Sequence, residues 1–138
     1  MPDEGELLAP TLDEHRPRDW ATRRPWRLSS QAYVGILGGP LAVGVIALVN
    51  AARLGMPRAA RRLVAAIAAA GTVLAVAAAA VAGGDAPRLL VQLGGALTFA
   101  ALHRVQRSAD RVHATFAPHV DPADTYASLW GPGIAAVA

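Results

Sequence analysis

The chain contains no cysteine and no lysine, and aromatic residues make up only 5% of its 138 residues. The missing cysteine excludes a disulfide framework, a cysteine-based zinc site and a thiol nucleophile. Because lysine is missing, all thirteen basic residues are arginines. This bias, together with the alanine-rich runs, is typical of a GC-rich genome, so we expect a bacterial source.

Charged side chains are also missing from three long apolar stretches, residues 32–49, 63–82 and 89–103. Arginines flank these stretches, and the whole chain is 54% hydrophobic with 17% charged residues. A helix needs about 20 mostly apolar residues to cross a bilayer. We therefore predict an all-α integral membrane protein, a bundle of three transmembrane helices. The predicted spans are residues 32–50, 60–83 and 88–104.

Three parts follow from this prediction. Residues 1–30 mix acids with arginines and contain few aliphatic side chains, so we expect a disordered, charged N-terminal tail without a cleavable signal peptide. Residues 31–117 form the transmembrane domain. Its last helix extends to about residue 117 as an amphipathic, cytoplasmic or interfacial extension, because apolar residues recur there every three or four positions. Residues 118–138 form an interfacial segment, in which a short helix begins at Asp121 and the Gly-Pro-Gly at residues 131–133 breaks it.

The first span is predicted to be irregular. The Gly-Gly-Pro at residues 38–40 kinks the helix, and Gly35 with Gly39 forms a GxxxG pair that permits close helix contact. Three full spans place six of the thirteen arginines on one side and seven on the other, so the positive-inside rule barely decides the orientation. A re-entrant first segment is the alternative, because it leaves only Arg88 on the outer side.

Aromatic side chains gather next to the predicted spans. Trp20, Trp26 and Tyr33 lie just before or at the start of the first span, where amphipathic rings favour the headgroup region. Tyr126, Leu129 and Trp130 are expected to rest in the interface as well. We therefore predict an aromatic belt around the membrane-facing part of the chain.

Polar side chains inside the spans are few. Gln92, Phe99 and Gln106 share one face of the third helix, which in an oligomer can meet its copies or line a narrow pore. A single glutamine bonded to a neighbouring helix is the favoured interpretation. Because pumps and ion-coupled transporters usually need ionisable groups along their pathway, the uncharged spans argue against that class.

No grouping of residues indicates a catalytic or metal site. His103, His113 and His119, with Asp121 and Asp124, are the one set of metal-binding side chains, but His103 and His113 face different sides of a helix. No serine stands with a histidine and a carboxylate at a recognisable spacing, and no glycine pair precedes the Lys-Ser/Thr of a phosphate loop. We therefore assign no catalytic, cofactor-binding or metal-binding residues and expect no cofactor.

The Gly-Gly-Pro-Leu-Ala at residues 38–42, followed by Asn50 and the Leu-Gly at residues 54–55, resembles a loose family of small bacterial membrane proteins of unknown function. In that family two more spans and a Gln/His-bearing segment follow, then a Ser-x-Trp before a last apolar stretch. The positions that match in this chain are Gln106, His113, Ser128 and Trp130. This chain lacks the full final span. The resemblance implies the architecture and carries no activity with it.

The sequence thus favours a small, non-enzymatic integral membrane protein that scaffolds or associates with other membrane proteins. The alternative is an oligomeric channel or transporter subunit. Because the arginines flank apolar spans and form no single stripe, we expect a lipid bilayer with anionic headgroups as the partner and no nucleic acid. Other membrane proteins or further copies of the chain are the other expected partners. The expected location is the bacterial plasma membrane, with several crossings.

Overall fold

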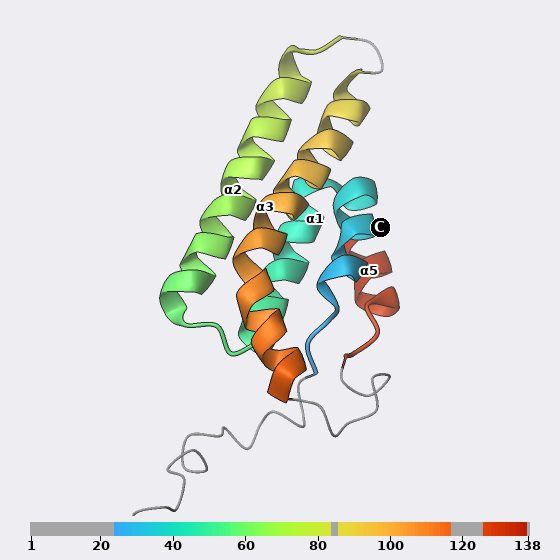
Figure 1. Cartoon of the computed structure of the whole chain (residues 1–138). Helices are drawn as coiled ribbons and strands as arrows, with labels where there is room; N and C mark the ends of the chain where they lie inside the picture. The colour runs from blue at the N-terminus through green and yellow to red at the C-terminus, as the bar shows by residue number, and fades with distance from the viewer. Residues whose placement is uncertain (1–23, 84–85, 117–125, 138) are drawn as a thin grey trace, which may run out of the picture.

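The computed structural model of the chain describes residues 24–83, 86–116 and 126–137. Within these residues it contains four α-helices and no β-strand, so the all-α prediction is confirmed for the described part (Figure 1). The helices are α1 (Gln31–Arg53), α2 (Arg58–Val81), α3 (Ala86–Phe116) and α5 (Trp130–Val137), with a 3₁₀ turn η2 (Leu28–Ser30) before α1.

Helix α1 is folded back on itself. In a straight helix, residues 26 and 50 would lie about 36 Å apart, yet the backbone N–H of Trp26 donates a hydrogen bond to Oδ1 of Asn50 at 2.7 Å. The reversal occurs at Gly39, whose φ of 74° and ψ of −171° lie outside the helical region. We call residues 31–38 the first arm, residues 40–53 the second arm and Gly39 the tip (Figure 1).

Local chemistry explains why the reversal occurs at the tip. A φ near 74° with ψ near 180° is open essentially only to glycine. Pro40 then begins the second arm, where its fixed φ suits a first helical turn and its missing N–H is not needed. The predicted kink is therefore present, and it is sharp enough to bring both arms back to one end of the molecule, which we call the base.

Small residues let the hairpin lie directly on α3. A Cβ added at Gly35 would stand 2.9 Å from the carbonyl oxygen of Gly95, and one added at Gly39 would stand 2.8 Å from Cγ1 of Val91. These separations are too short for any side chain larger than hydrogen. The GxxxG pair identified in the sequence therefore serves a contact within the chain.

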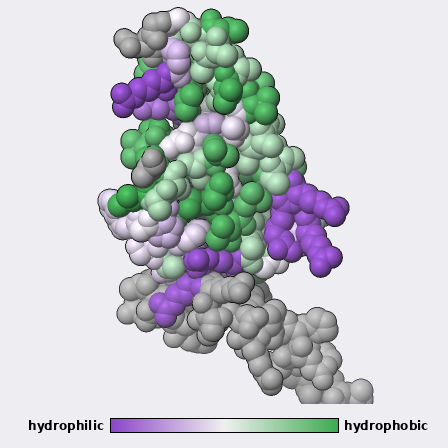
Figure 2. Space-filling view, turned by 180° about the vertical axis from the view of Figure 1, so that it is seen from behind, coloured by the Kyte–Doolittle hydropathy of each residue, from purple (hydrophilic) through white to green (hydrophobic). Residues whose placement is uncertain are grey.

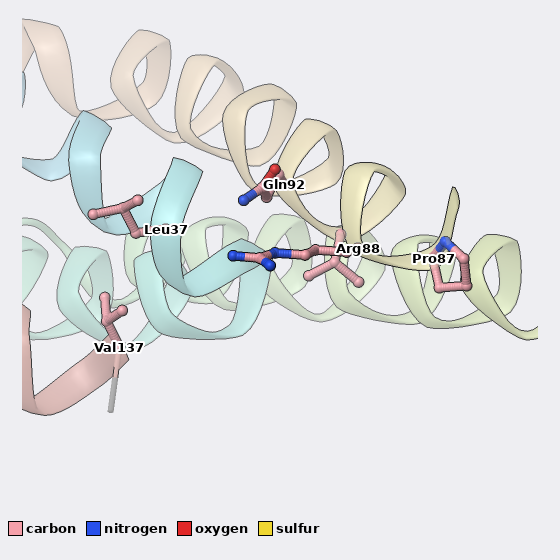
Figure 3. Close-up of a pocket in the computed structure, with 6 residues that line it drawn as sticks. Leu37, Pro87, Arg88, Gln92 and Val137 are labelled. Carbon is pink, nitrogen blue, oxygen red and sulfur yellow. The ribbon is translucent and has the colours of Figure 1, made fainter. Parts of the chain in front are cut away.

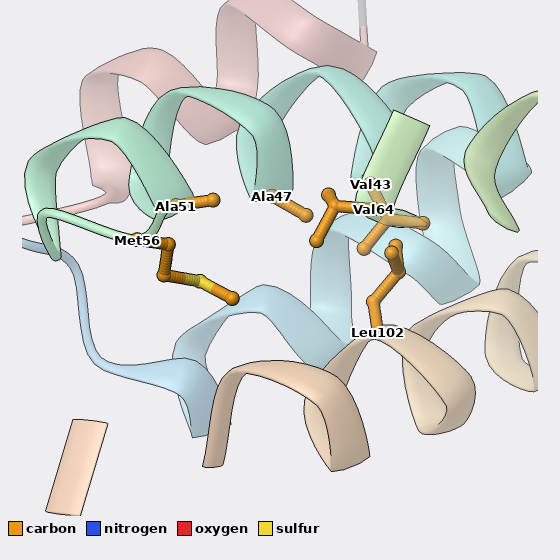
Figure 4. Packing of buried hydrophobic residues seen from close by; sticks show 6 residues of the cluster. All are labelled: Val43, Ala47, Ala51, Met56, Val64 and Leu102. Carbon is orange, nitrogen blue, oxygen red and sulfur yellow. The ribbon is translucent and has the colours of Figure 1, made fainter. Parts of the chain in front are cut away.

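Helix α2 lies against both α1 and α3, as its alanine content suggested. Gly55, with φ 66°, ends the second arm of α1, and α2 then runs antiparallel to that arm. A Cβ at Gly44 would be 2.6 Å from Cβ of Ala68, and one at Gly94 would be 2.8 Å from Cβ of Ala75. A compact apolar core fills the space between the second arm, α2 and α3 (Figure 4). Its buried members are Val43, Ala47, Ala51, Met56, Val64 and Leu102.

Two helical segments, and not the three that were predicted, are long and apolar enough to cross a membrane: Leu28–Arg53 and Arg58–Val81. Helix α3 is long enough but not apolar enough, because polar and charged side chains recur along it. Those side chains include Arg88, Gln92, His103, Arg104 and Gln106. Because Leu28–Arg53 is folded back at Gly39, its longer arm extends only about 21 Å along the bundle.

Helix α3 runs without interruption for 31 residues, about 46 Å. The predicted long last helix is therefore present, and it ends at Phe116, one residue before the expected boundary.

The C-terminal helix corrects another prediction. The Gly-Pro-Gly at residues 131–133 was expected to break a helix, but α5 begins at Trp130 and contains it. Pro132 stands in the first turn, where no backbone N–H is required, and the N–H of Gly133 donates to the carbonyl of Leu129 at 2.7 Å. The short helix predicted from Asp121 lies outside the described residues.

The two ends of the described chain meet at the base. The N–H of Ala127 donates to the carbonyl of Pro25 at 2.9 Å, next to an isolated parallel bridge between Trp26 and Ala127. Residues 24–30 of the predicted tail are therefore packed against the helices, so the boundary predicted at residue 30 is too late. Residues 1–23 lie outside the described part.

Candidate functional site

A buried hydrogen-bond network occupies the base between α1 and α3. Asn50 accepts from the backbone of Trp26, and its Nδ2 faces Oε1 of Gln106 at 3.5 Å. Gln106 in turn donates from Nε2 to the carbonyl of Ala47 at 2.7 Å. Both side chains are fully buried. The network joins the segment before η2, the second arm of α1 and the lower part of α3.

Arg53 closes this network toward the surface. Its guanidinium carbon lies 3.9 Å from the centre of the Trp26 ring, and its Nη1 donates to the carbonyl of Arg24 at 3.1 Å. A cation over an indole face is the favourable geometry for such a pair. Trp26 is only 4% exposed. The predicted membrane belt is therefore wrong for Trp26, whose ring is covered by protein.

The other aromatic residues divide between protein and surface. Tyr33 donates from its hydroxyl to the carbonyl of Leu129 at 2.8 Å, and its ring stacks on Trp130 with 5.9 Å between centres. Leu129 is 4% exposed, so its interfacial placement is also wrong, whereas Trp130 remains 72% exposed. Trp20 lies outside the described residues. These contacts fasten α5 to the first arm of α1.

One turn above the network, two buried nitrogens have no hydrogen-bond partner within the described part: Nε2 of Gln31 and Nδ1 of His103. Gly35 contacts Phe99, and the first arm runs antiparallel to α3, so Gln31 and His103 lie at the same level. The Phe99 and His103 rings are 5.6 Å apart. Gln31 was not identified from the sequence, although a glutamine directly before an apolar run was the available signal.

The polar face predicted on the third helix is directed at α1. Gln106 bonds to the second arm and Phe99 packs against the first, so the interpretation of a glutamine bonded to a neighbouring helix holds for Gln106. Gln92 differs, because it lines a pocket. Between Gln106 and Gln92, the first arm packs directly on α3, because a Cβ added at Gly35 would stand 2.9 Å from the backbone carbonyl of Gly95. This contact separates the base network from the pocket.

The pocket lies beside the tip of α1 and has a volume of about 540 Å³ (Figure 3). Three elements form it: the end of the first arm, the start of α3 and the end of α5. Arg88 extends toward α1, with Gln92 one turn further along α3 (Figure 3). Apolar side chains supply the remaining walls. The lining residues are Leu37, Pro87, Arg88, Val91, Gln92 and Val137.

The outer surface of the helices is strongly apolar. Large hydrophobic side chains stand exposed on every helix, with Leu74 at 70%, Val81 at 88% and Leu97 at 65%. In the most apolar 18-residue stretch of α2, only 11% is buried. In the corresponding stretch of the folded α1 segment, 50% is buried. Apolar residues cover much of the face seen in Figure 2, with hydrophilic ones gathered above and below. A patch this large marks a membrane or protein contact.

Among the described residues, one titratable group has a displaced pKa, and it lies at the base. The hydroxyl of Tyr126 donates to Oδ1 of Asp110 at 3.2 Å, and the guanidinium carbon of Arg27 lies 5.5 Å from the Tyr126 ring centre. Burial raises the pKa of Tyr126 above 10.0, and the negative charge of Asp110 raises it further. This contact ties the segment before α5 to α3.

No group of three or more histidine, cysteine, aspartate or glutamate side chains in residues 24–83, 86–116 and 126–137 can hold a metal ion. Of the histidines considered from the sequence, the ring of His103 lies tilted against Phe99, and the ring of His113 lies 5.8 Å from that of Tyr126. His119, with both neighbouring aspartates, lies outside the described residues. The structure brings the three histidines into no common site that it describes.

No protein-family model matches the chain, and no curated protein or solved structure is significantly similar to it. The resemblance to small bacterial membrane proteins therefore stays a prediction. Three features of the structure bear on function: the apolar outer surface, the buried base network and the pocket beside the tip.

Proposed function

We propose that the chain is a small integral membrane protein in which α2 and α3 cross the bilayer and α1 is a re-entrant hairpin. The observation that carries this proposal is the exposed apolar surface of α2. In a soluble protein, an apolar helix of this length would be mostly buried, whereas α2 presents most of its apolar surface outward. A bilayer offers that surface a favourable solvent.

The low hydropathy of α3 is compatible with a crossing because its polar side chains face inward. Thr98 and Gln106 are 4% and 0% exposed. Leu89, Leu93 and Leu97, spaced four residues apart, form the outward stripe, with exposures between 57% and 65%. A crossing helix needs an apolar face toward lipid, and α3 supplies one while its other face bonds to α1.

The arginines support an orientation. With α1 folded back, all described arginines except Arg88 belong to the base or to the turns next to it. The positive-inside rule then places the base in the cytoplasm and the tip side outside. Arg88 and Arg104 are about 24 Å apart along α3, shorter than the bilayer core of about 30 Å, so both side chains would extend outward to reach the headgroups. We propose a bacterial plasma membrane location on this basis.

Single-cysteine labelling in cells tests the topology, and the cysteine-free chain gives a clean background. Cysteines are introduced at the exposed positions Ser29, Ala59, Gly83 and Ser108 and treated with a membrane-impermeant maleimide. The re-entrant arrangement predicts labelling at Gly83 alone. Three full spans predict that Ser29 and Gly83 share one side, and this outcome would overturn the proposal. No labelling at any of the four positions in intact cells, with labelling at all four once the cells are permeabilised, would overturn membrane insertion itself.

We infer that the role is non-enzymatic association with another transmembrane helix. The polar side chains of the base network bond to each other and to backbone, so they hold the fold together. The outer face of α2 is rich in alanine, which lets a second helix approach closely. The exposed alanines in the membrane-facing part of α2 are Ala66, Ala69, Ala70, Ala77 and Ala80.

Disulfide cross-linking in native membranes tests this role. A cysteine at Ala70 reports on the alanine face of α2, and a cysteine at Leu93 is the matched control on the leucine stripe of α3. Association through α2 predicts cross-linked products from the Ala70 variant and none from the Leu93 variant. A strictly monomeric protein in both variants, with no partner recovered from native membranes, would refute association.

A channel or transporter subunit is the second candidate, and the pocket at the α1 tip favours it. Broken helices and non-helical backbone at membrane depth are features of transporter sites. Gln92 lies in that pocket beside Arg88. Substrate-dependent flux in proteoliposomes that is lost on Gln92→Leu would favour transport, whereas unchanged flux relative to protein-free vesicles would exclude it.

A further inference from the structure

We propose that the pocket beside the α1 tip binds the phosphate group of a membrane phospholipid. This inference rests on the proposed membrane placement, and it assigns a ligand class to a site that association alone does not require. The pocket has a volume of about 540 Å³ and combines one charged and one amide side chain with apolar walls. That combination matches an amphiphilic ligand better than a wholly polar one.

The polar part of the pocket suits a phosphate diester. Arg88 presents a planar guanidinium, which binds phosphate oxygens through paired, charge-assisted hydrogen bonds. Gln92 lies four residues later on the same helix face, one turn deeper in the proposed membrane. Its amide can donate to the ester carbonyls of a lipid, which lie below the phosphate in a bilayer. The order of the two side chains along α3 therefore follows the order of the lipid's own polar groups.

The apolar part of the pocket distinguishes a lipid from a free anion. Leu37, from the first arm of α1, is 63% exposed, and Val137, at the end of α5, is 37% exposed. Both lie across the pocket from Arg88 (Figure 3). An acyl chain would cover these side chains, whereas inorganic phosphate would leave them bare. The proposal therefore commits to a phospholipid as the source of the phosphate.

An arginine at the end of a crossing helix can also contact lipid headgroups unspecifically, by extending its side chain to the membrane interface. Two features of the structure distinguish such unspecific contact from binding in the pocket. The pocket is built by α1, α3 and α5 together, so a bulky residue on α5 would block it while leaving Arg88 in place. A second arginine, Arg104, lies exposed on α3 toward the base and offers a matched contact outside the pocket.

The experiment measures phospholipid retained by the full-length protein, purified in mild detergent and analysed by native mass spectrometry. Arg88→Gln and Gln92→Leu are compared with Arg104→Gln. We expect Arg88→Gln to weaken binding on the order of tenfold, because a charge-assisted phosphate contact is lost, and Arg104→Gln to leave retention unchanged. Val137→Trp should also lower retention, because it fills the pocket without removing a charge. Gel filtration and circular dichroism confirm that each variant is folded.

Three outcomes would overturn the site. Equal loss in Arg88→Gln and Arg104→Gln would mean unspecific arginine–lipid contact. Full retention in Val137→Trp would place the lipid elsewhere. Radiolabelled inorganic phosphate held by lipid-free wild-type protein, and lost in Arg88→Gln, would assign a free phosphate instead. These results are distinguishable from failure of the membrane placement, because the cysteine labelling described above tests that placement without reference to bound lipid.

Discussion

Replacing Asn50 by leucine removes the central member of the base network with little change in volume. The backbone N–H of Trp26 then loses its acceptor at 2.7 Å, and Trp26 is too deeply buried for water to replace it. A buried donor left without a partner costs about 1–3 kcal/mol. The 3.5 Å approach to Gln106 is too long to add much. We therefore expect Asn50→Leu to lower the free energy of unfolding by about 1–3 kcal/mol, a factor of roughly 5 to 150 in the folding equilibrium.

Thr72→Val is the matched control. Thr72 is also a polar residue within a long apolar helix, but its hydroxyl donates to the carbonyl of Ala68 in the same helix at 2.8 Å. Replacing it by valine leaves no buried polar group unpaired, because the donor hydroxyl is removed and the carbonyl of Ala68 still accepts a backbone hydrogen bond within the helix. Side-chain hydrogen bonds inside membrane proteins average about 0.6 kcal/mol. The control should therefore cost well below the amount expected for Asn50→Leu.

Unfolding in mixed micelles with increasing denaturing detergent measures both values. Trp26 is the reporter, in a background where Trp20 and Trp130 are phenylalanine, because the guanidinium of Arg53 lies 3.9 Å from its ring centre and leaves when the base opens. Circular dichroism follows the helices in parallel. If Asn50→Leu proves no more destabilising than Thr72→Val, the network does not hold the α1 hairpin closed, and the reasoning from the stranded N–H is wrong.

Two further predictions use matched comparisons. Gly39→Ala and Gly55→Ala both place a methyl group on a residue with positive φ. At Gly39 the backbone conformation is open essentially only to glycine, and the added methyl carbon would stand 2.8 Å from Cγ1 of Val91. At Gly55 the space around the added methyl carbon is open. In the same unfolding assay we expect about 2–3 kcal/mol for Gly39→Ala and about 1 kcal/mol for Gly55→Ala, and equal costs would contradict the strained tip. The raised pKa of Tyr126 means that its contribution to stability is present below pH 10.0 and is lost as the pH rises through the folded pKa. In a phenolate absorbance titration, Asp110→Asn should lower that pKa, and an unchanged titration would exclude the contact.

The helices themselves could be predicted from the sequence because their signals are local. Apolar runs without charge, glycine at Gly55 and proline at Pro57 mark where α1 ends and α2 begins, and the recurrence of apolar residues predicts the long α3. The C-terminal helix was misplaced for an equally local reason. The Gly-Pro-Gly at residues 131–133 predicts a helix break, but a proline in the first turn of a helix is no obstacle.

The reversal of α1 could be predicted only in part. The Gly-Gly-Pro at residues 38–40 indicates a bend, but its angle depends on contacts between residues far apart in the sequence. Those contacts are the bond from Trp26 to Asn50 and the approach of Gly35 to the Gly95 backbone. A single sequence gives no information about such pairs, so the re-entrant form remained one of two alternatives. Gln31 was missed for the same reason, since its burial depends on α3.

The first apolar run was counted as a full span because hydropathy gives the length of an apolar run and not its path, and the chain reverses at Gly39 within that run. The exposed face of α3 carries leucines, and the face toward α1 holds polar side chains. The same division separates the base network from the tip pocket, because Gly35 and Gly95 leave no room for a side chain where the first arm crosses α3. A solute could pass from Gln92 to Gln106 only if the first arm moved away from α3. The Trp26–Asn50 bond ties the start of that arm to the second arm and so restrains its movement. The stability of Asn50→Leu therefore bears on the choice between a scaffold and a transporter.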